Sequence, residues 1–178
     1  AQCKHMSDHT DIGAQVSVDE PMVANEAGDG PTVALIDCGA KGSIVSSLIE
    51  RDATVHILPY DTTKSEVDAI APDVLFVSNG PGDPVNFEAA GELVTDYVGE
   101  VPLAGICLGQ QVVANALGGE TEKMEFGHRG VNQPVRDLRT DQVVMTTQNH
   151  GYTVADPGEK LDVTQINVND DTPEGLEN

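Results

Sequence analysis

The chain has 178 residues, of which 39% are hydrophobic, and this length and composition suit one globular domain with a substantial core. Nine Lys and Arg residues against thirty Asp and Glu residues give a formal net charge of −21, which argues against nucleic acid or a membrane as a partner because both attract basic surfaces. The acidic residues are spread along the sequence, so we expect a halophilic surface that molar salt stabilises.

Residues 1–30 are polar and rich in glycine and aspartate towards their end, so we expect a tail or an interdomain linker there. From 31 to 178 we expect one domain that begins with alternating strands and helices. Apolar runs typical of buried parallel strands stand at 32–38, 53–60, 74–80 and 101–108. Helical periodicity is found at 42–52, 64–73 and 87–100, and again from Leu108 onward. We expect Ser43 to be the N-cap of the first of these helices and Pro72 to end the second.

After Gly119 the sequence changes to shorter strand-like segments joined by turns, at 122–137, 141–156 and 161–170. We expect them to extend the sheet or to form an antiparallel appendage. The predicted fold class is therefore α/β, with a mostly parallel sheet, helices on both faces and shorter antiparallel strands. In such sheets the chemistry lies at the carboxyl ends of the strands, where two glycine-rich turns are expected here, SNGPGDP and GICLG.

Cys107 stands in the pattern Gly-x-Cys-x-Gly between a predicted strand and a predicted helix. The same pattern with serine forms a nucleophile elbow, a strained turn whose small flanking residues let neighbouring chains approach closely. The helix from Leu108 would direct its first amides at the sulfur, which favours the thiolate. We predict that Cys107 is a nucleophile and that the amide of Leu108 donates to an oxyanion; a cysteine that only packs is the alternative.

The turn SNGPGDP, at 78–84, holds two glycines and two prolines, which makes it rigid. The amide of Gly82 could be a second oxyanion donor, and Gly80 could let a substrate lie against the backbone. An ordinary connecting turn is the alternative.

Two histidines are candidates for the base that takes the proton of a cysteine nucleophile: His150, in QNHGYT, and His128, in FGHRG. A structural role is the commoner one for a histidine, and the sequence gives no distance for either. His5 and His9 lie in the N-terminal segment and His56 lies within a predicted strand, so we discount these three.

The three cysteines, Cys3, Cys38 and Cys107, form no disulfide framework and no metal-binding pair. Cys38 lacks elbow glycines on both sides and is interpreted as a packed thiol. The sequence shows no zinc-ligand spacing, no phosphate-binding loop, no signal peptide and no apolar run of membrane-span length. We therefore expect a cytoplasmic protein without a metal site.

Four motifs stand in the order and approximate spacing of one enzyme family: SNGPGDP, GICLGQQ, KMEFGHRGVNQPV and QNHGYTV. In these motifs residues 31–178 resemble the class I glutamine amidotransferases, and more narrowly the glutaminase domain of carbamoyl-phosphate synthase small subunits. The resemblance implies a flavodoxin-like fold and hydrolysis of L-glutamine through a cysteine γ-glutamyl thioester. It also implies that the ammonia passes to a carbamoyl-phosphate synthase large subunit that holds ATP and Mg, so no cofactor is expected in this chain.

Matched position by position, the resemblance makes Cys107 the nucleophile. It assigns glutamine binding to Gly80, Gly82, Leu108, Gln111, Asn149, Gly151 and Tyr152. His150 matches a position that is not the general base of the family.

The catalytic His and Glu of the family stand in a His-Pro-Glu motif that would follow Asn178, so the C-terminal part of the domain is expected to be missing here. We expect this chain alone to turn over glutamine poorly, because loss of a catalytic base costs several orders of magnitude. Two other interpretations stay open: a glutaminase of a different amidotransferase, and a non-catalytic docking or regulatory relative.

Overall fold

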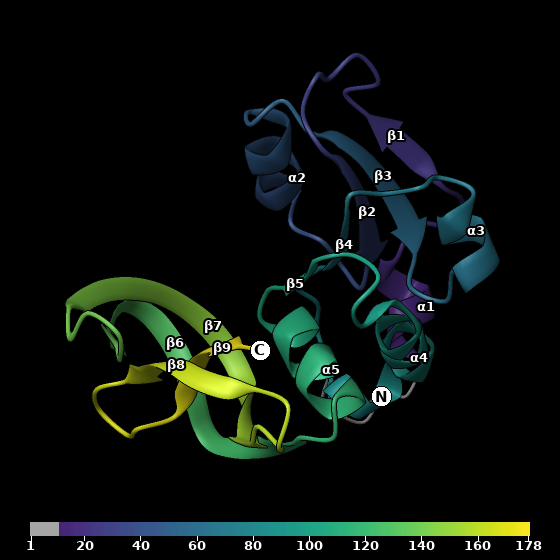
Figure 1. Ribbon diagram of the computed structural model, residues 1–178. Coiled ribbons are helices and arrows are strands. Elements are labelled where there is room, and N and C mark those ends of the chain that lie inside the picture. The colour runs from purple at the N-terminus through teal and green to yellow at the C-terminus, as the bar shows by residue number, and fades with distance from the viewer. Residues whose placement is uncertain (1–10) are drawn as a thin grey trace, which may run out of the picture. The chain divides into compact units, whose positions relative to one another are not determined.

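The computed structural model describes residues 11–178, which form two compact units, one ending at Val113 and one spanning Ala114–Asn178 (Figure 1). Each unit is described by itself. Cys3, His5 and His9 lie outside the described residues. Among the described residues, no helix combines the length and the apolar character needed to cross a membrane.

The first unit is built on a five-stranded sheet in the order β1-β3-β2-β4-β5. Its strands are β1 (Met22–Ala24), β2 (Thr32–Asp37), β3 (Thr54–Pro59), β4 (Val74–Val77) and β5 (Leu103–Gly105). All neighbours pair in parallel except β1, which lies antiparallel along β3. After β2 the chain adds β3 on one side of it and then crosses to add β4 and β5 on the other side. The strand order therefore reverses between β2 and β4, and sheets of this type bind their ligands at such a point. The predicted mostly parallel α/β sheet is confirmed.

The helices that connect these strands are shorter than their sequence patterns. They are α1 (Ile12–Val16), α2 (Gly42–Ile49), α3 (Lys64–Asp68), α4 (Glu88–Tyr97) and α5 (Leu108–Ala116), with a 3-10 turn at Pro84–Asn86. The N-cap of α2 is Lys41, so the prediction of Ser43 was wrong by two positions. α3 ends at Asp68, before Pro72, and Ala71 between them takes a left-handed φ of 50°.

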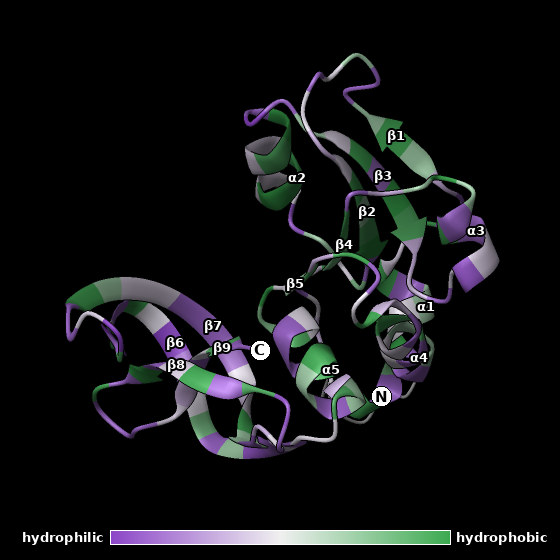
Figure 2. Ribbon diagram, in the orientation of Figure 1, coloured by the Kyte–Doolittle hydropathy of each residue, from purple (hydrophilic) through white to green (hydrophobic). Residues whose placement is uncertain are grey.

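The core of the first unit follows from the alternation of side chains along β2. Val33 and Leu35 point to the face covered by α2, whose apolar side chains Ile44, Val45, Leu48 and Ile49 pack there. The next residue, Ile36, points to the opposite face and is also fully buried. Figure 2 shows the resulting hydrophobic colouring of β2, typical of a strand covered on both sides.

The N-terminal segment contributes to this unit, although a tail or linker was expected there. β1 pairs with β3, and Ile12 of α1 is only 5% exposed. Residues 12–24 thus supply one edge strand and part of the core. A linker role for residues 1–30 stays a prediction.

The second unit carries an antiparallel sheet in the order β7-β6-β8-β9. Its strands are β6 (Glu120–Asp137), β7 (Val143–Asp156), β8 (Asp162–Asn167) and β9 (Pro173–Glu177). The antiparallel appendage is thereby confirmed, and β6 and β7, with 18 and 14 residues, lie on the predicted segments 122–137 and 141–156. Register shifts between Lys123 and His128 and between Gly130 and Gln133 interrupt the pairing. Such bulges break the alternation of side chains between the two faces of the strand.

Candidate functional site

Cys107 lies on the turn between β5 and α5, and its backbone is in the left-handed region, with a φ of 55°. For a residue with a Cβ this conformation costs roughly 1–3 kcal/mol, so it persists only where the surrounding structure imposes it. The thiol is half-buried. A strained, accessible side chain between a strand and a helix has the geometry of a nucleophile elbow.

Two flanking glycines allow this turn. A Cβ on Gly105 would lie 2.6 Å from the carbonyl carbon of Gly109, and a Cβ on Gly109 would lie 2.1 Å from the carbonyl oxygen of Val77. Neither distance leaves room for a carbon atom. Both glycines of the Gly-x-Cys-x-Gly pattern are therefore needed for α5 to begin directly against β4.

α5 begins at the residue after Cys107. The amide of Gln111 donates to the carbonyl of Cys107 at 3.2 Å, so the helix starts from the cysteine itself. The first amides of a helix have no intrahelical acceptor, and the dipole places partial positive charge there. The side chain of Leu108 is 1% exposed and that of Gln111 is 6% exposed, so packing holds this turn in place.

The turn at 78–84 follows β4 and packs against the same elbow. A Cβ on Gly80 would lie 2.0 Å from the carbonyl oxygen of Cys38 and 2.7 Å from Leu108 Cδ2. The space beside Gly80 is thus filled by protein, which gives this glycine a packing role. Gly82 has a φ of 94°, and a Cβ on it would lie 2.9 Å from Cγ2 of Ile12 in α1.

Hydrogen bonds tie this turn to the end of β2. The amide of Cys38 donates to Ser78 Oγ at 2.9 Å, and the amide of Lys41 donates to Asn79 Oδ1 at 2.9 Å. The carbonyl of Gly39 accepts from Asn79 Nδ2 at 3.3 Å. Ser78 and Asn79 therefore hold the two loops at the carboxyl ends of β2 and β4 together.

Asp37 is a positioning residue that the sequence analysis missed. It is 5% exposed, and its Oδ1 accepts the amides of Gly39 at 2.9 Å and Ala40 at 2.7 Å. Its Oδ2 accepts the amide of Val18 at 2.9 Å. An acidic residue at the end of an apolar strand, followed closely by glycine, is the signal that could have identified it, because Asp caps turns of this kind.

Cys38 differs from Cys107 in its surroundings. It is fully buried, and burial, followed by the neighbouring carboxylate of Asp37, raises the pKa of its thiol from 9.0 to about 12. A thiol that stays protonated is a poor nucleophile. The interpretation of Cys38 as a packed thiol agrees with this environment.

The eight residues predicted for the site fall into both units. Gly80, Gly82, Cys107, Leu108 and Gln111 belong to the first. Asn149, Gly151 and Tyr152 belong to the second, on β7. In the strand pairing Asn149 opposes Arg129 of β6, and Tyr152 opposes Lys123.

The two candidate bases, His128 and His150, lie together in the second unit and oppose each other in the pairing of β6 with β7. Their rings are 4.9 Å apart between centroids, and His128 lies between the carboxylates of Asp170 and Glu174. His56 is a residue of β3, as expected. Asp170 and Glu174 could not be predicted as partners, because nothing in their spacing relates them to the histidines.

Comparison with known proteins gives a consistent picture. The family of class I glutamine amidotransferases matches residues 34–178. The carbamoyl phosphate synthase small chain of Halobacterium salinarum is 64% identical over 178 residues, which cover 99% of this chain and 49% of that protein. The protein of the same name from Methanopyrus kandleri is 48% identical over 97% of this chain and 48% of its own length. The chain therefore spans about half the length of the curated relatives it matches.

Solved structures show the same fold. The crystal structure of a glutamine amidotransferase from Thermotoga maritima superimposes with a TM-score of 0.64 over 82% of this chain and 70% of that one. At 14% sequence identity this likeness establishes the fold alone.

Proposed function

Because the chain belongs to the class I glutamine amidotransferases, we propose that it is the glutamine-hydrolysing part of a carbamoyl phosphate synthase. The observation that carries the chemistry is the strained elbow at Cys107, with its φ of 55° and the start of α5 at the next residue. The 64% identity to the Halobacterium salinarum small chain favours this synthase over other amidotransferases. The same relative supports the proposal of a halophilic surface.

In the proposed reaction the Cys107 thiolate attacks the side-chain amide carbon of L-glutamine, and a carbon–sulfur bond forms. The negative charge moves to the carbonyl oxygen, where the amides of Leu108 and Gly82 would stabilise it. When the carbon–nitrogen bond breaks, the nitrogen takes up a proton and leaves as ammonia. Water then attacks the γ-glutamyl thioester, which releases glutamate and regenerates the thiol.

The remaining substrate contacts are proposed from the resemblance. Gly80 would contribute to glutamine binding by letting its turn pack closely against α5, and Gln111 would contribute from the first turn of that helix. Asn149, Gly151 and Tyr152 would contribute to glutamine binding from β7.

We propose that neither His128 nor His150 accepts the proton of the thiol. The contacts of His128 with Asp170 and Glu174 and of His150 with Gln148 and the Tyr152 carbonyl support structural roles for both histidines. In the family the acceptor stands in a His-Pro-Glu motif, which the sequence does not contain. A polypeptide of these 178 residues alone is therefore proposed to turn over glutamine several orders of magnitude more slowly than a domain that contains this motif.

The ammonia would be used by a large subunit that binds ATP and Mg and makes carbamoyl phosphate, so this chain would need no cofactor of its own. The experiment that tests this assignment is reconstitution of the full-length protein with that large subunit, assayed for carbamoyl phosphate with glutamine or with ammonium as nitrogen source. Cys107→Ser should abolish the glutamine-dependent reaction and leave the ammonium-dependent one. Cys38→Ala, which removes the other described cysteine, should keep both reactions.

Each outcome decides between functions. Glutamine-dependent synthesis that survives Cys107→Ser would reject the elbow as the nucleophile. Glutamine hydrolysis without carbamoyl phosphate would identify the glutaminase of another amidotransferase. Binding to the large subunit without any hydrolysis would identify a docking or regulatory relative.

A further inference from the structure

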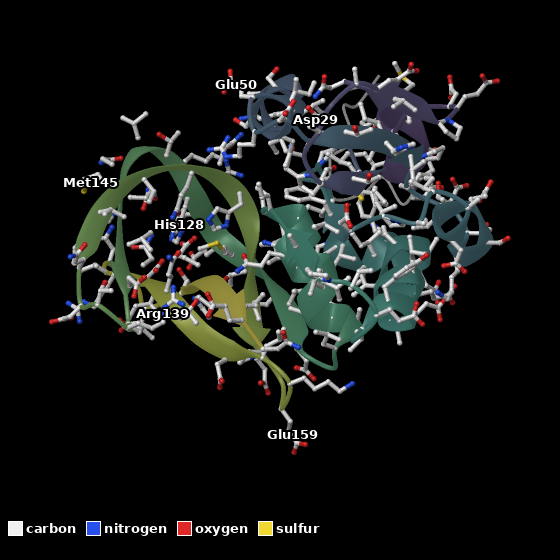
Figure 3. The ribbon with its side chains drawn as sticks, turned by 45° about the horizontal axis from the view of Figure 1, so that its top comes forward. Asp29, Glu50, His128, Arg139, Met145 and Glu159 are labelled. Carbon is white, nitrogen blue, oxygen red and sulfur yellow. The ribbon has the colours of Figure 1, made fainter. Side chains whose placement is uncertain are left out.

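Three side chains that commonly bind metal ions converge in the second unit: His128 of β6, His150 of β7 and Glu174 of β9. Their donor atoms lie within 4.8 Å of one another. His128 and His150 are direct partners in the antiparallel register, so both rings stand on the same face. His128 is 7% exposed, and Figure 3 places it inside the curl of the β6–β7 ribbon, whereas Met145 lies at the outer edge.

Glu174 reaches the two rings from a bulge in β9. In the β8–β9 pair Gly175 opposes Gln165 and Pro173 opposes Ile166, so Glu174 is the additional residue between them. Bulges of this kind redirect a side chain. Here the carboxylate oxygen Oε1 of Glu174 lies 3.1 Å from His128 Nδ1 and 3.8 Å from His150 Nε2.

The shorter hydrogen bond of His150 favours one tautomer of the ring. Its Nδ1 is 2.9 Å from the carbonyl oxygen of Tyr152, which can only accept, so this contact needs the proton on Nδ1. In the neutral ring Nε2 then has a lone pair, and it faces the Oε1 of Gln148 at 3.2 Å as well as that of Glu174. The Gln148 amide is held this way round because its Nε2 donates to Thr146 Oγ1, whose hydroxyl donates to the carbonyl of Gln133.

His128 is held in the corresponding way. Its Nε2 is 2.7 Å from Asp170 Oδ2. A carboxylate accepts, so in the tautomer that donates to Asp170 the proton is on Nε2 and the lone pair of Nδ1 faces Glu174. Asn167 Nδ2, at 3.3 Å from the same Nδ1, can donate to it when no metal is bound.

The geometry points to a site for a divalent transition-metal ion of the zinc class, held by His128 Nδ1, His150 Nε2 and Glu174. Two imidazoles and a carboxylate are a ligand set that suits zinc and its first-row neighbours. Bonds of about 2.0–2.1 Å to a tetrahedral ion place ligand atoms roughly 3.3 Å apart, and the observed 3.1 and 3.8 Å lie on either side of that value. The remaining position would take a water molecule.

The outer contacts of the cluster support this assignment. A metal-bound histidine usually donates its other ring N–H to a backbone carbonyl or a carboxylate, which fixes its tautomer. The carbonyl of Tyr152 and the carboxylate of Asp170 do this for His150 and His128. The ion would join three strands, and the site does not depend on the proposed glutaminase chemistry.

The test measures Zn²⁺ binding to the tag-free full-length protein in a Cys107→Ser background, which removes the elbow thiolate as a ligand. Glu174→Gln removes one ligand charge, and Glu177→Gln removes the same charge from the same strand outside the cluster. Because Cys3, His5 and His9 could also bind Zn²⁺, the stoichiometry is compared between variants. We expect one Zn²⁺ per chain more in the parent and in Glu177→Gln than in Glu174→Gln. Asp170→Asn should retain the ion with an affinity roughly 10- to 100-fold lower.

Co²⁺ in place of Zn²⁺ provides a second readout, since a tetrahedral nitrogen and oxygen site gives intense visible absorption that Glu174→Gln should lose. The same Zn²⁺ stoichiometry in all variants, or equal losses in both Glu variants, would overturn the proposal and leave a hydrogen-bonded histidine pair without metal. Should Glu174→Gln fail to fold without metal, the Zn²⁺ affinity of Asp170→Asn decides whether the site exists. The side chain of Asp170 is 41% exposed and is not one of the proposed ligands. An affinity unchanged by Asp170→Asn would then count against the site.

Discussion

Gly109 packs directly on the end of β4, where a Cβ on it would lie 2.1 Å from the carbonyl oxygen of Val77. That oxygen cannot move away freely, because it accepts the amide of Ile106 at 3.2 Å, and Val77 is paired with β2 and β5. The elbow therefore packs tightly against the end of β4, and the position of the thiol depends on the absence of a side chain at Gly109.

Gly109→Ala should destabilise the protein by about 1–3 kcal/mol, because the added methyl group must displace backbone that is already hydrogen-bonded. The matched control is Gly42→Ala at the start of α2, where a Cβ would meet nothing within 4 Å. That variant should be stabilised by a few tenths to about 1 kcal/mol, since alanine restricts the unfolded chain. Urea unfolding of both variants checks the prediction, which fails if the two free energies of unfolding change equally.

The strain at Cys107 gives a second prediction. Cys107→Ala and Cys107→Gly both remove the thiol, so both should lower glutamine hydrolysis by about 10⁴-fold or more. Only glycine adopts the φ of 55° without a steric penalty, so Cys107→Gly should be about 1 kcal/mol more stable than Cys107→Ala. Thermal unfolding of the pair measures this difference. Greater stability of the alanine variant would mean that the turn relaxes in solution.

The parallel sheet could be predicted because each of its buried strands is a continuous apolar run, as in Thr32–Asp37, and such runs stand out without knowledge of their partners. The elbow could be predicted because all its determinants lie within five residues. The predicted helix ends were less accurate. The left-handed φ of Ala71, after the end of α3, has no signal in the sequence, because alanine does not favour this conformation.

The histidine cluster could not be predicted, for a different reason. His128 and Glu174 meet because a bulge in each strand shifts the register, and a shift of one residue exchanges the two faces of a strand. The sequence does not state where those bulges fall. For the same reason no short metal-ligand spacing links these residues, which come from three different strands.

Cys38 gives a prediction on pH dependence. Its pKa is about 12 in the folded protein against 9.0 ordinarily, mainly because of burial, so between these pH values the unfolded chain loses the thiol proton while the folded protein keeps it. Stability should therefore fall as pH rises from about 9 to 12, with a contribution from this thiol of at most about 1.4 kcal/mol per pH unit.

The comparison that isolates this term is Cys38→Ala, measured by urea unfolding at several alkaline pH values. The variant should be less stable than the parent at pH 8, because it leaves a small cavity, but the difference should shrink as pH rises. A difference that stays constant across this range would show that Cys38 titrates alike in both states.

The acidic surface predicts a strong dependence on salt. With a net charge of −21, repulsion between exposed carboxylates opposes folding at low ionic strength, and molar KCl shortens its range to about 3 Å. The melting temperature should therefore rise by several degrees from low to molar KCl. Neutralising three exposed acids, in Glu20→Gln, Glu50→Gln and Glu159→Gln together, should raise the melting temperature at low salt and reduce its slope against KCl concentration. A melting temperature that falls with KCl would instead mean that surface ion pairs, such as Lys64 with Glu100 at 2.9 Å, outweigh the repulsion.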